Sequence, residues 1–264
     1  MERGDITTMY IIGENPAQSE ADTGRAVELL EGLEHLIVQD IFLNETAKFA
    51  HVFLPGSSFL EKNGTFINAE RRINRVRPVM KPQQGKDEWR ITQEIARAMG
   101  YDMNYPSAAA IMDEIAELTP TFRNVSFRFL DEVGSVQWPC NDAAPEGTPY
   151  MHEQEFVRGK GKFVLTEFQP TPERTTRKFP LILTTGRILS QYNVGAQTRR
   201  TENSIWHSED VLEIHPHDAE VRGIKEGDWV KLVDRRGQLI AVGTVAERIG
   251  SGKVGLVQPK IVFS

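Results

Sequence analysis

The chain has very little cysteine. Its 264 residues contain a single thiol, Cys140. One thiol cannot form an internal disulfide, a zinc site made of cysteines alone or an iron–sulfur cluster. Because Cys140 follows a proline and no histidine is close to it in the sequence, we expect a buried, inert thiol rather than a nucleophile. The lack of a disulfide framework is typical of a cytoplasmic protein.

Long apolar runs and an excess of positive charge are also missing. No run approaches the ~20 apolar residues that span a bilayer, and residues 1–5 do not resemble the start of a signal peptide. A net charge of −6 argues against nucleic acid as the main partner. No glycine-rich phosphate fingerprint is present, so a standard dinucleotide fold is not supported. The composition, 39% hydrophobic and 26% charged, is that of a soluble globular chain.

Strand and helix patterns alternate through the first third of the chain. Apolar runs at 8–13, 36–40 and 51–56 predict buried strands. Helical spacing between 26 and 33 separates the first two strands, and Asn44 is a candidate cap for a short helix before the third. This order predicts a parallel sheet with right-handed crossovers.

Polar residues follow these predicted strands, and ligands of parallel sheets lie at the carboxyl ends of the strands. Asp40 can accept two hydrogen bonds from a guanine edge or a ribose, although a turn or helix-capping role is the alternative. Asn15 precedes a proline and is by default a turn residue, and Thr46 follows the second strand.

Two amphipathic helices are predicted next. The first covers Trp89 to Met99, with Asp87 where a cap would lie. The second runs from about 108 to 118 and is capped by Ser107. Before them comes a run of cations that could meet phosphates, although an ion-pair network is the commoner outcome. These cations are Arg71, Arg72 and Arg75.

The pattern loosens from 120 to about 178, which predicts a connector in which only residues 163–166 read as a strand. An apolar strand at 181–183 then runs into two threonines, a glycine and Arg187. Hydroxyl donors, an accessible backbone and a planar cation suit a phosphate or a polar heterocycle. The alternative is an ordinary turn with a surface arginine. Tyr192 adds a flat face on which a ring can stack.

The rest of the last third predicts an antiparallel hairpin series that closes into a small barrel. Its strands fall at 211–214, 229–234 and 239–245, with a short helix at 216–222. Two histidines flank Pro216, but they lack further ligands at usable spacing and are expected at the surface rather than on a metal.

Nine short motifs, taken in order, resemble one family. They are GENP (13–16), VQDIF (38–42), ETA (45–47), FLP (53–55), EKNGTF (61–66), NAERR (68–72), DEW (87–89), QWPC (137–140) and LTTGR (183–187). Their order is similar to that in the C-terminal part of the molybdopterin oxidoreductases, most closely the catalytic alpha subunit of formate dehydrogenase. The resemblance covers nearly the whole chain.

The resemblance implies a partial Rossmann-like domain at 1–119, a connector at 120–178 and a six-stranded double-psi barrel at 179–264. It also implies that both domains bind molybdopterin guanine dinucleotide, the cofactor that carries molybdenum or tungsten. The residues it places on the guanine are Asp40 and Asp87, and those on the nucleotide are Asn15 and Thr46. The residues it places on the pterin or its phosphates are Thr185, Gly186, Arg187 and Tyr192.

The family's metal-ligating cysteine or selenocysteine, its histidine and arginine at the metal, and its iron–sulfur cysteines lie upstream of the matched region. We therefore expect no catalytic or metal-ligating residue here, and no activity from this chain alone. Residues 255–264 depart from the family's pattern, so the chain looks truncated at both ends, as a split-gene product, a pseudogene product or a deliberately made piece would be.

These expectations make the chain a C-terminal fragment of an enzyme that oxidises formate to carbon dioxide. It would be completed by the remaining part of the catalytic subunit or by other formate dehydrogenase subunits. The alternatives are a stand-alone carrier module for the pterin dinucleotide and a non-functional remnant.

Overall fold

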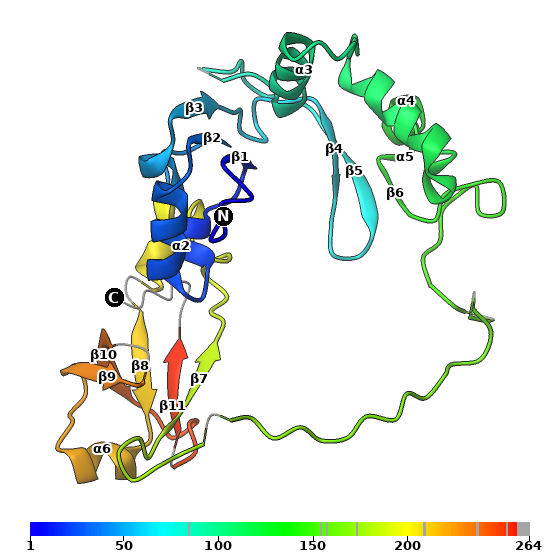
Figure 1. Cartoon of the computed structure of the whole chain (residues 1–264). Coiled ribbons are helices and arrows are strands. Elements are labelled where there is room, and N and C mark those ends of the chain that lie inside the picture. Colours follow the sequence, from blue (N-terminus) through cyan, green and yellow to red (C-terminus); the bar gives the residue numbers. More distant parts are fainter. Residues whose placement is uncertain are drawn as a thin grey trace. The chain divides into compact units, whose positions relative to one another are not determined.

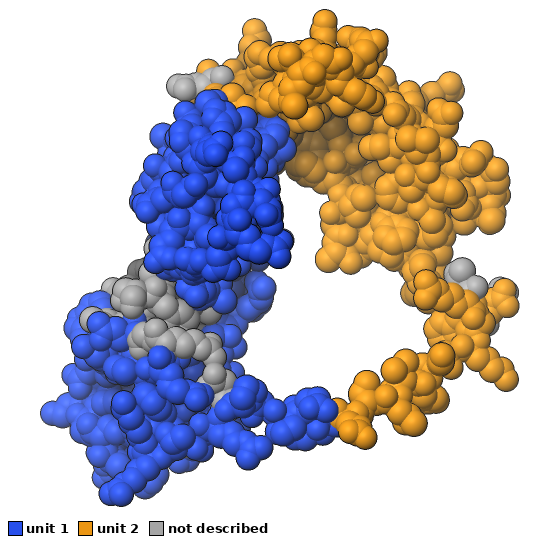
Figure 2. All heavy atoms as spheres, viewed as in Figure 1, with its two compact units in different colours: residues 1–53, 168–264 blue, residues 54–167 orange. Residues whose placement is uncertain are grey.

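A computed structural model describes the chain except for residues 84, 154, 157, 173, 208–209, 236–237, 252 and 258–264 (Figure 1). Most of the departing C-terminal stretch therefore lies outside the described residues. Contacts between residues divide the chain into two compact units (Figure 2). Unit 1 combines Met1–Phe53 with Phe168–Ser264, and unit 2 is Leu54–Glu167. The domain boundaries that the resemblance implies remain a prediction, because units defined by contacts need not coincide with family domains.

A parallel sheet opens the chain, as predicted. Strands β1 (Thr8–Ile12), β2 (His35–Asp40) and β3 (Val52–Pro55) form a three-stranded sheet in the order β1-β2-β3. β1 and β2 run parallel, with Ile11 opposite Val38. The connections hold α1 (Pro16–Ser19), α2 (Thr23–Glu31) and the 3-10 helix η1 (Thr46–Phe49). The predicted alternation of strand and helix is confirmed.

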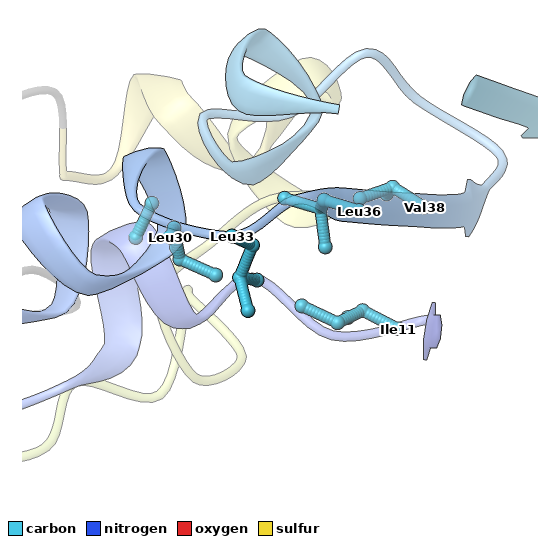
Figure 3. Close-up of a cluster of buried hydrophobic side chains, with 6 residues drawn as sticks. Ile11, Leu30, Leu33, Leu36 and Val38 are labelled. Atoms are coloured by element: carbon cyan, nitrogen blue, oxygen red, sulfur yellow. The ribbon is translucent and has the colours of Figure 1, made fainter. Parts of the chain in front are cut away.

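An apolar cluster holds this sheet to its helices. Leu36 and Val38 on β2 are fully buried, and Leu30 from α2 packs into the same cluster as Ile11 from β1 (Figure 3). Asp22 caps α2 by accepting a hydrogen bond from the backbone of Arg25 at 3.1 Å. Burial of these side chains fixes the sheet, so the polar residues beyond Val38 project from a rigid base.

A mixed sheet fills the last third of the chain. Its strands are β7 (Ile182–Gly186), β8 (Val211–Ile214), β9 (Trp229–Val233), β10 (Gln238–Val245) and β11 (Lys253–Val257). Their order is β7-β11-β8-β10-β9. Short 3-10 helices η3 (Thr198–Arg200) and η4 (Glu202–Ile205) follow β7, and α6 (Pro216–Arg222) follows β8.

The predicted antiparallel hairpin series is only partly right. β9 and β10 form the expected antiparallel hairpin, but β8 pairs with β10 in parallel and β7 pairs with β11 in parallel. Parallel pairing requires a crossover, and α6 together with β9 provides one between β8 and β10. The five described strands form a curled sheet, and closure into a six-stranded double-psi barrel remains a prediction.

Unit 2 contains an antiparallel sheet and three α-helices in its described residues. β4 (Gly64–Ile67), β5 (Arg72–Val76) and β6 (Ser135–Gln137) form the sheet. The helices are α3 (Glu88–Ala98), α4 (Ala108–Leu118) and α5 (Phe127–Val133), with the 3-10 helix η2 (Pro120–Phe122) before α5. Ser107 caps α4 by accepting from the backbone of Ala110 at 3.2 Å, as predicted.

The expected connector is more ordered at its start than its sequence suggests. η2, α5 and β6 all lie within 120–178. The strand predicted at 163–166 is wrong, because those residues have no regular structure and the side chains of Phe163 and Leu165 are 96% and 98% exposed. A β-prone segment forms a strand only where another strand pairs with it. No helix among the described residues is long and apolar enough to cross a membrane.

Candidate functional site

Two buried side chains join the loops that follow β1 and β2. Asn15 Oδ1 accepts hydrogen bonds from the backbone N of Thr46 at 3.1 Å and from Thr46 Oγ1 at 2.8 Å. Asn15 Nδ2 donates to Gln18 Oε1 at 2.8 Å, and Thr46 Oγ1 accepts from the backbone N of Ala17 at 3.1 Å. Asn15 and Thr46 therefore hold the two strand ends together, and most of their hydrogen-bonding capacity is used within the protein.

Asp40 holds the turn after β2. Its Oδ1 accepts from the backbone N of Phe42 and its Oδ2 from Asn44 Nδ2, both at 2.9 Å. Asn44 is buried, and its Oδ1 accepts from the backbone N of Ala47 at 3.0 Å; the N-cap position of η1 is nevertheless Glu45, one residue after the predicted cap. Each carboxylate oxygen keeps a second lone pair, so this turn role is compatible with a contact to a bound base.

The residues predicted to contact the pterin lie at the end of β7 and just beyond it. Thr185 and Gly186 are the last two residues of β7, and both are exposed. Arg187, which follows them, is also exposed. Arg187 Nη1 donates to Asn193 Oδ1 at 3.2 Å. The side chain of Tyr192 is 76% exposed, so one flat face remains accessible.

Buried donors without a partner lie in the same segment. Gln191 is only 7% exposed, and its Oε1 accepts from Thr198 Oγ1 at 2.7 Å. Its Nε2 has no hydrogen-bond partner within the described part of the chain, and the same holds for Arg199 Nε. Arg199 Nη2 donates to Asp210 Oδ1 at 2.8 Å. Sequence reasoning missed Gln191, because no local pattern reveals that a glutamine is buried.

The loop after β2 and the segment after β7 touch within unit 1. The guanidinium of Arg200, in η3, lies 4.6 Å from the centre of the Phe42 ring. The backbone of Phe42 donates to Asp40, and Arg200 follows Arg199 directly. This contact places the turn that Asp40 stabilises next to residues 185–200, which we call the donor-rich segment. The two are far apart in the sequence.

Asp87 belongs to unit 2 and lines a groove there. It occupies the N-cap position of α3 but makes no side-chain capping bond. Ser57 Oγ instead donates to Asp87 Oδ1 at 3.3 Å. The groove has a volume of about 640 Å³ and is lined by charged residues of both signs, including Lys86 and Arg90.

The chemistry of unit 1 suits an anionic nucleotide. Between 185 and 200 the available groups are hydroxyls, an amide, guanidinium groups and a tyrosine ring, and guanidinium groups bind phosphate with well-defined geometry. Unpartnered buried donors are costly unless a ligand satisfies them, so Gln191 and Arg199 fit a phosphate or a polar heterocycle. No group of three metal-ligating side chains occurs among the described residues.

Two parts of the chain match known protein families. Residues 1–98 match the family described as molybdopterin oxidoreductase, and residues 181–260 match the molydopterin dinucleotide binding domain. The chain is thus similar to the molybdopterin oxidoreductase family over its first 98 residues. These matches cover most of unit 1 and the part of unit 2 that contains Asp87.

Curated relatives of the chain include formate dehydrogenase alpha subunits. The F420-dependent formate dehydrogenase subunit alpha of Methanocaldococcus jannaschii is 38% identical over 256 residues, covering 95% of this chain and 38% of the relative. The F420-dependent formate dehydrogenase 2 subunit alpha of Methanococcus maripaludis is 40% identical over 257 residues, covering 94% and 38%. The chain thus spans about 38% of the length of these relatives.

A solved structure has a similar fold. Acetylene hydratase from Pelobacter acetylenicus aligns with a TM-score of 0.72 at 17% identity, covering 97% of this chain and 38% of that protein. At this identity the likeness concerns the fold alone.

Three neighbouring arginines of unit 2 are held by contacts within the protein. Arg75 Nε pairs with Asp131 at 3.0 Å, and Arg72 Nε pairs with Glu70 at 3.0 Å. Arg71 donates from Nη2 to the backbone carbonyls of Thr148 and Pro149 at 2.9 and 3.0 Å. These contacts favour the ion-pair interpretation of the run over phosphate binding.

Proposed function

We propose that unit 1 binds molybdopterin guanine dinucleotide and that the chain serves as part of a formate dehydrogenase-like catalytic subunit. The observation that carries this proposal is the donor-rich segment at 185–200, which has buried unpartnered donors and lies against the turn held by Asp40. When bound, the cofactor supplies the molybdenum or tungsten at which formate is oxidised to carbon dioxide with release of two electrons.

The residues of this chain bind and orient the cofactor in this proposal. Arg187 neutralises phosphate charge, and Thr185 and Gly186 offer a hydroxyl and an accessible backbone beside it. Tyr192 presents a face to a ring, and Gln191 donates an additional hydrogen bond. All five belong to β7 or the segment that follows it.

Two carboxylates are proposed to bind guanine, Asp40 within unit 1 and Asp87 within the groove of unit 2. Asp40 and Asp87 accept hydrogen bonds from guanine N–H groups, each within its own unit. Asn15 and Thr46 contribute through the loops that they hold at the strand ends. No residue of this chain performs the redox step, which requires the metal-ligating residue of the remaining subunit sequence.

The test is cofactor retention by the purified full chain. The chain is produced in a host that makes the cofactor, and released GMP and oxidised pterin are measured by mass analysis. Retention of both without formate-dependent dye reduction is expected of this chain alone. Such a result is also what a carrier module would give, so the chain is then mixed with the remainder of a catalytic subunit. Restored formate oxidation supports the fragment, and a lack of bound nucleotide and pterin contradicts the proposal.

Arg187→Ala gives a sharper test of the site. A cation that faces phosphate contributes about 1.5–3 kcal/mol, so retention should fall roughly tenfold to a hundredfold. Arg187 is exposed and its Nη1 donates a hydrogen bond to Asn193 Oδ1, so its truncation should leave the fold intact. Arg128→Ala is the matched control, since that arginine is 91% exposed and pairs with Glu132 on its own helix. Equal retention by both variants would count against the assignment.

A further inference from the structure

The side chain of Asp87 does not cap α3, although Asp87 occupies the N-cap position of that helix. An aspartate at an N-cap usually accepts a hydrogen bond from the second or third backbone N–H of its helix. Here the backbone N of Arg90 donates to the main-chain O of Asp87 at 2.9 Å, and the side chain makes no capping bond. The carboxylate of Asp87 is therefore free of the capping bond and is available to another partner.

Ser57 is that partner. It is 1% exposed, and its Oγ donates to Asp87 Oδ1 at 3.3 Å. The two segments are locked together beside this bond, because Gly56 and Lys86 form a parallel β-bridge. A Cβ on Gly85 would lie 2.2 Å from the carbonyl O of Gly56, so only glycine permits this approach. The position of Ser57 relative to Asp87 is thus fixed by the backbone.

The groove beside this bond has the size and chemistry to hold a nucleobase. Its volume of about 640 Å³ lies within the range of small-molecule sites. Arg90 stands at 5.0 Å from the ring of Trp89, and its Nε is 3.8 Å from Asp87 Oδ2. The groove is also lined by apolar side chains, Val79 and Met80, which suit the faces of a base.

We infer that Ser57 is a positioning residue that sets the preference of this groove for guanine over adenine. Guanine presents two adjacent donors, N1–H and the 2-amino group, and a carboxylate accepts both only when its plane is fixed. Adenine presents an acceptor at N1, which would face a carboxylate oxygen. The bond from Ser57 fixes the plane of Asp87 and prevents its return to the helix end. This inference rests on the proposed function.

Photolabelling of the full chain tests the inference at the groove itself. The probes are 8-azido-GMP and 8-azido-AMP, and peptide mapping measures the label within residues 78–94. The unaltered chain should be labelled preferentially by the guanine probe. In Ser57→Ala that preference should fall about tenfold, because discrimination by hydrogen bonding depends on a fixed partner. Ser107→Ala is the matched control, since it also removes one serine hydrogen bond from unit 2 but does not touch the groove.

The outcomes separate this inference from the proposed function. A guanine preference that survives in Ser57→Ala overturns the role of Ser57, whatever the chain retains. A chain that carries no dinucleotide and shows no label at 78–94 overturns the proposed function as well. Asp87→Asn covers the case in which Ser57→Ala does not fold: an amide in place of the carboxylate should lower the preference while Ser57 is intact. An unchanged preference in Asp87→Asn contradicts the inference.

Discussion

The two aspartates proposed to contact guanine are held by different means. Asp40 has a local donor on each carboxylate oxygen, from the backbone of Phe42 and the amide of Asn44. Asp87 has the hydroxyl of Ser57 on one oxygen and the more distant Arg90 beside the other. A substitution at Asp40 therefore changes the fold of its loop as well as any ligand contact, whereas Asp87 can be altered with less structural effect.

Asp40→Asn should lower the stability of unit 1. The amide places an NH₂ against either the backbone N–H of Phe42 or the Nδ2 of Asn44, so one donor faces another donor. Loss of such a buried or half-buried bond costs about 1–3 kcal/mol. Urea denaturation followed by tryptophan fluorescence measures the change.

Asp5→Asn is the control for this prediction, because that residue is exposed and its carboxylate pairs with the exposed Arg3. A lower urea midpoint in Asp40→Asn than in the control is the expected result. Equal midpoints would show that the turn does not depend on the carboxylate.

Elements with a strong local pattern were predictable from the sequence. α4 and α6 have the predicted bounds, and Ser107 caps α4 as expected. The first two strands also lie where short apolar runs placed them. Periodicity and capping are properties of neighbouring residues, so they are visible in one sequence.

Features that depend on distant residues were not predictable. The parallel pairing of β8 with β10 is decided by a crossover, and residues 163–166 form no strand because strand formation requires a pairing partner. The burial of Gln191 and the bond between Ser57 and Asp87 follow from tertiary packing. Strand-end reasoning singled out Asp40, whose part in binding remains a prediction, whereas the hydrogen-bond network around it depends on tertiary contacts.

The burial of Cys140 in the core of unit 2 can be tested by the reactivity of its thiol. Cys140 is fully buried beside Leu130 of α5 and Val136 of β6, and its Sγ donates to the carbonyl of Pro145 at 3.5 Å. Burial raises the pKa of the Cys140 thiol, because the thiolate loses its hydration. The thiol should therefore react slowly with an aromatic disulfide reagent while unit 2 is folded, and at the rate of a free cysteine in urea.

The raised pKa of Cys140 also predicts how the stability of unit 2 changes with pH. The unfolded thiol ionises near its ordinary pKa of about 8.5, whereas the folded thiol stays protonated to higher pH. Above that pH the unfolded state binds fewer protons than the folded state, so the stability of unit 2 should fall as pH rises. Cys140→Ser lacks this titration and is the control. Rapid labelling of the folded chain at neutral pH would contradict the burial of the thiol.

At the scale of the whole molecule, the chain leaves unit 1, forms unit 2 and returns. Unit 1 therefore consists of two segments that are separated by more than a hundred residues, Met1–Phe53 and Phe168–Ser264. The contact of Arg200 with Phe42 is one of the interactions between them. The described residues between β6 and β7 include exposed basic side chains at Arg158, Lys160 and Lys162 that lie outside any helix or strand.

Limited trypsin digestion should cut first at these three positions, because proteases act on exposed backbone without regular structure. Each of the two resulting fragments then holds one segment of unit 1. If the segments pack as one unit, the fragments should elute together in gel filtration under native conditions and separate in urea. Arginines inside α3, such as Arg97, should be cut more slowly. Separate elution without urea would show that Met1–Phe53 and Phe168–Ser264 do not form a common unit, and the proposed cofactor site in unit 1 would then lose its physical basis.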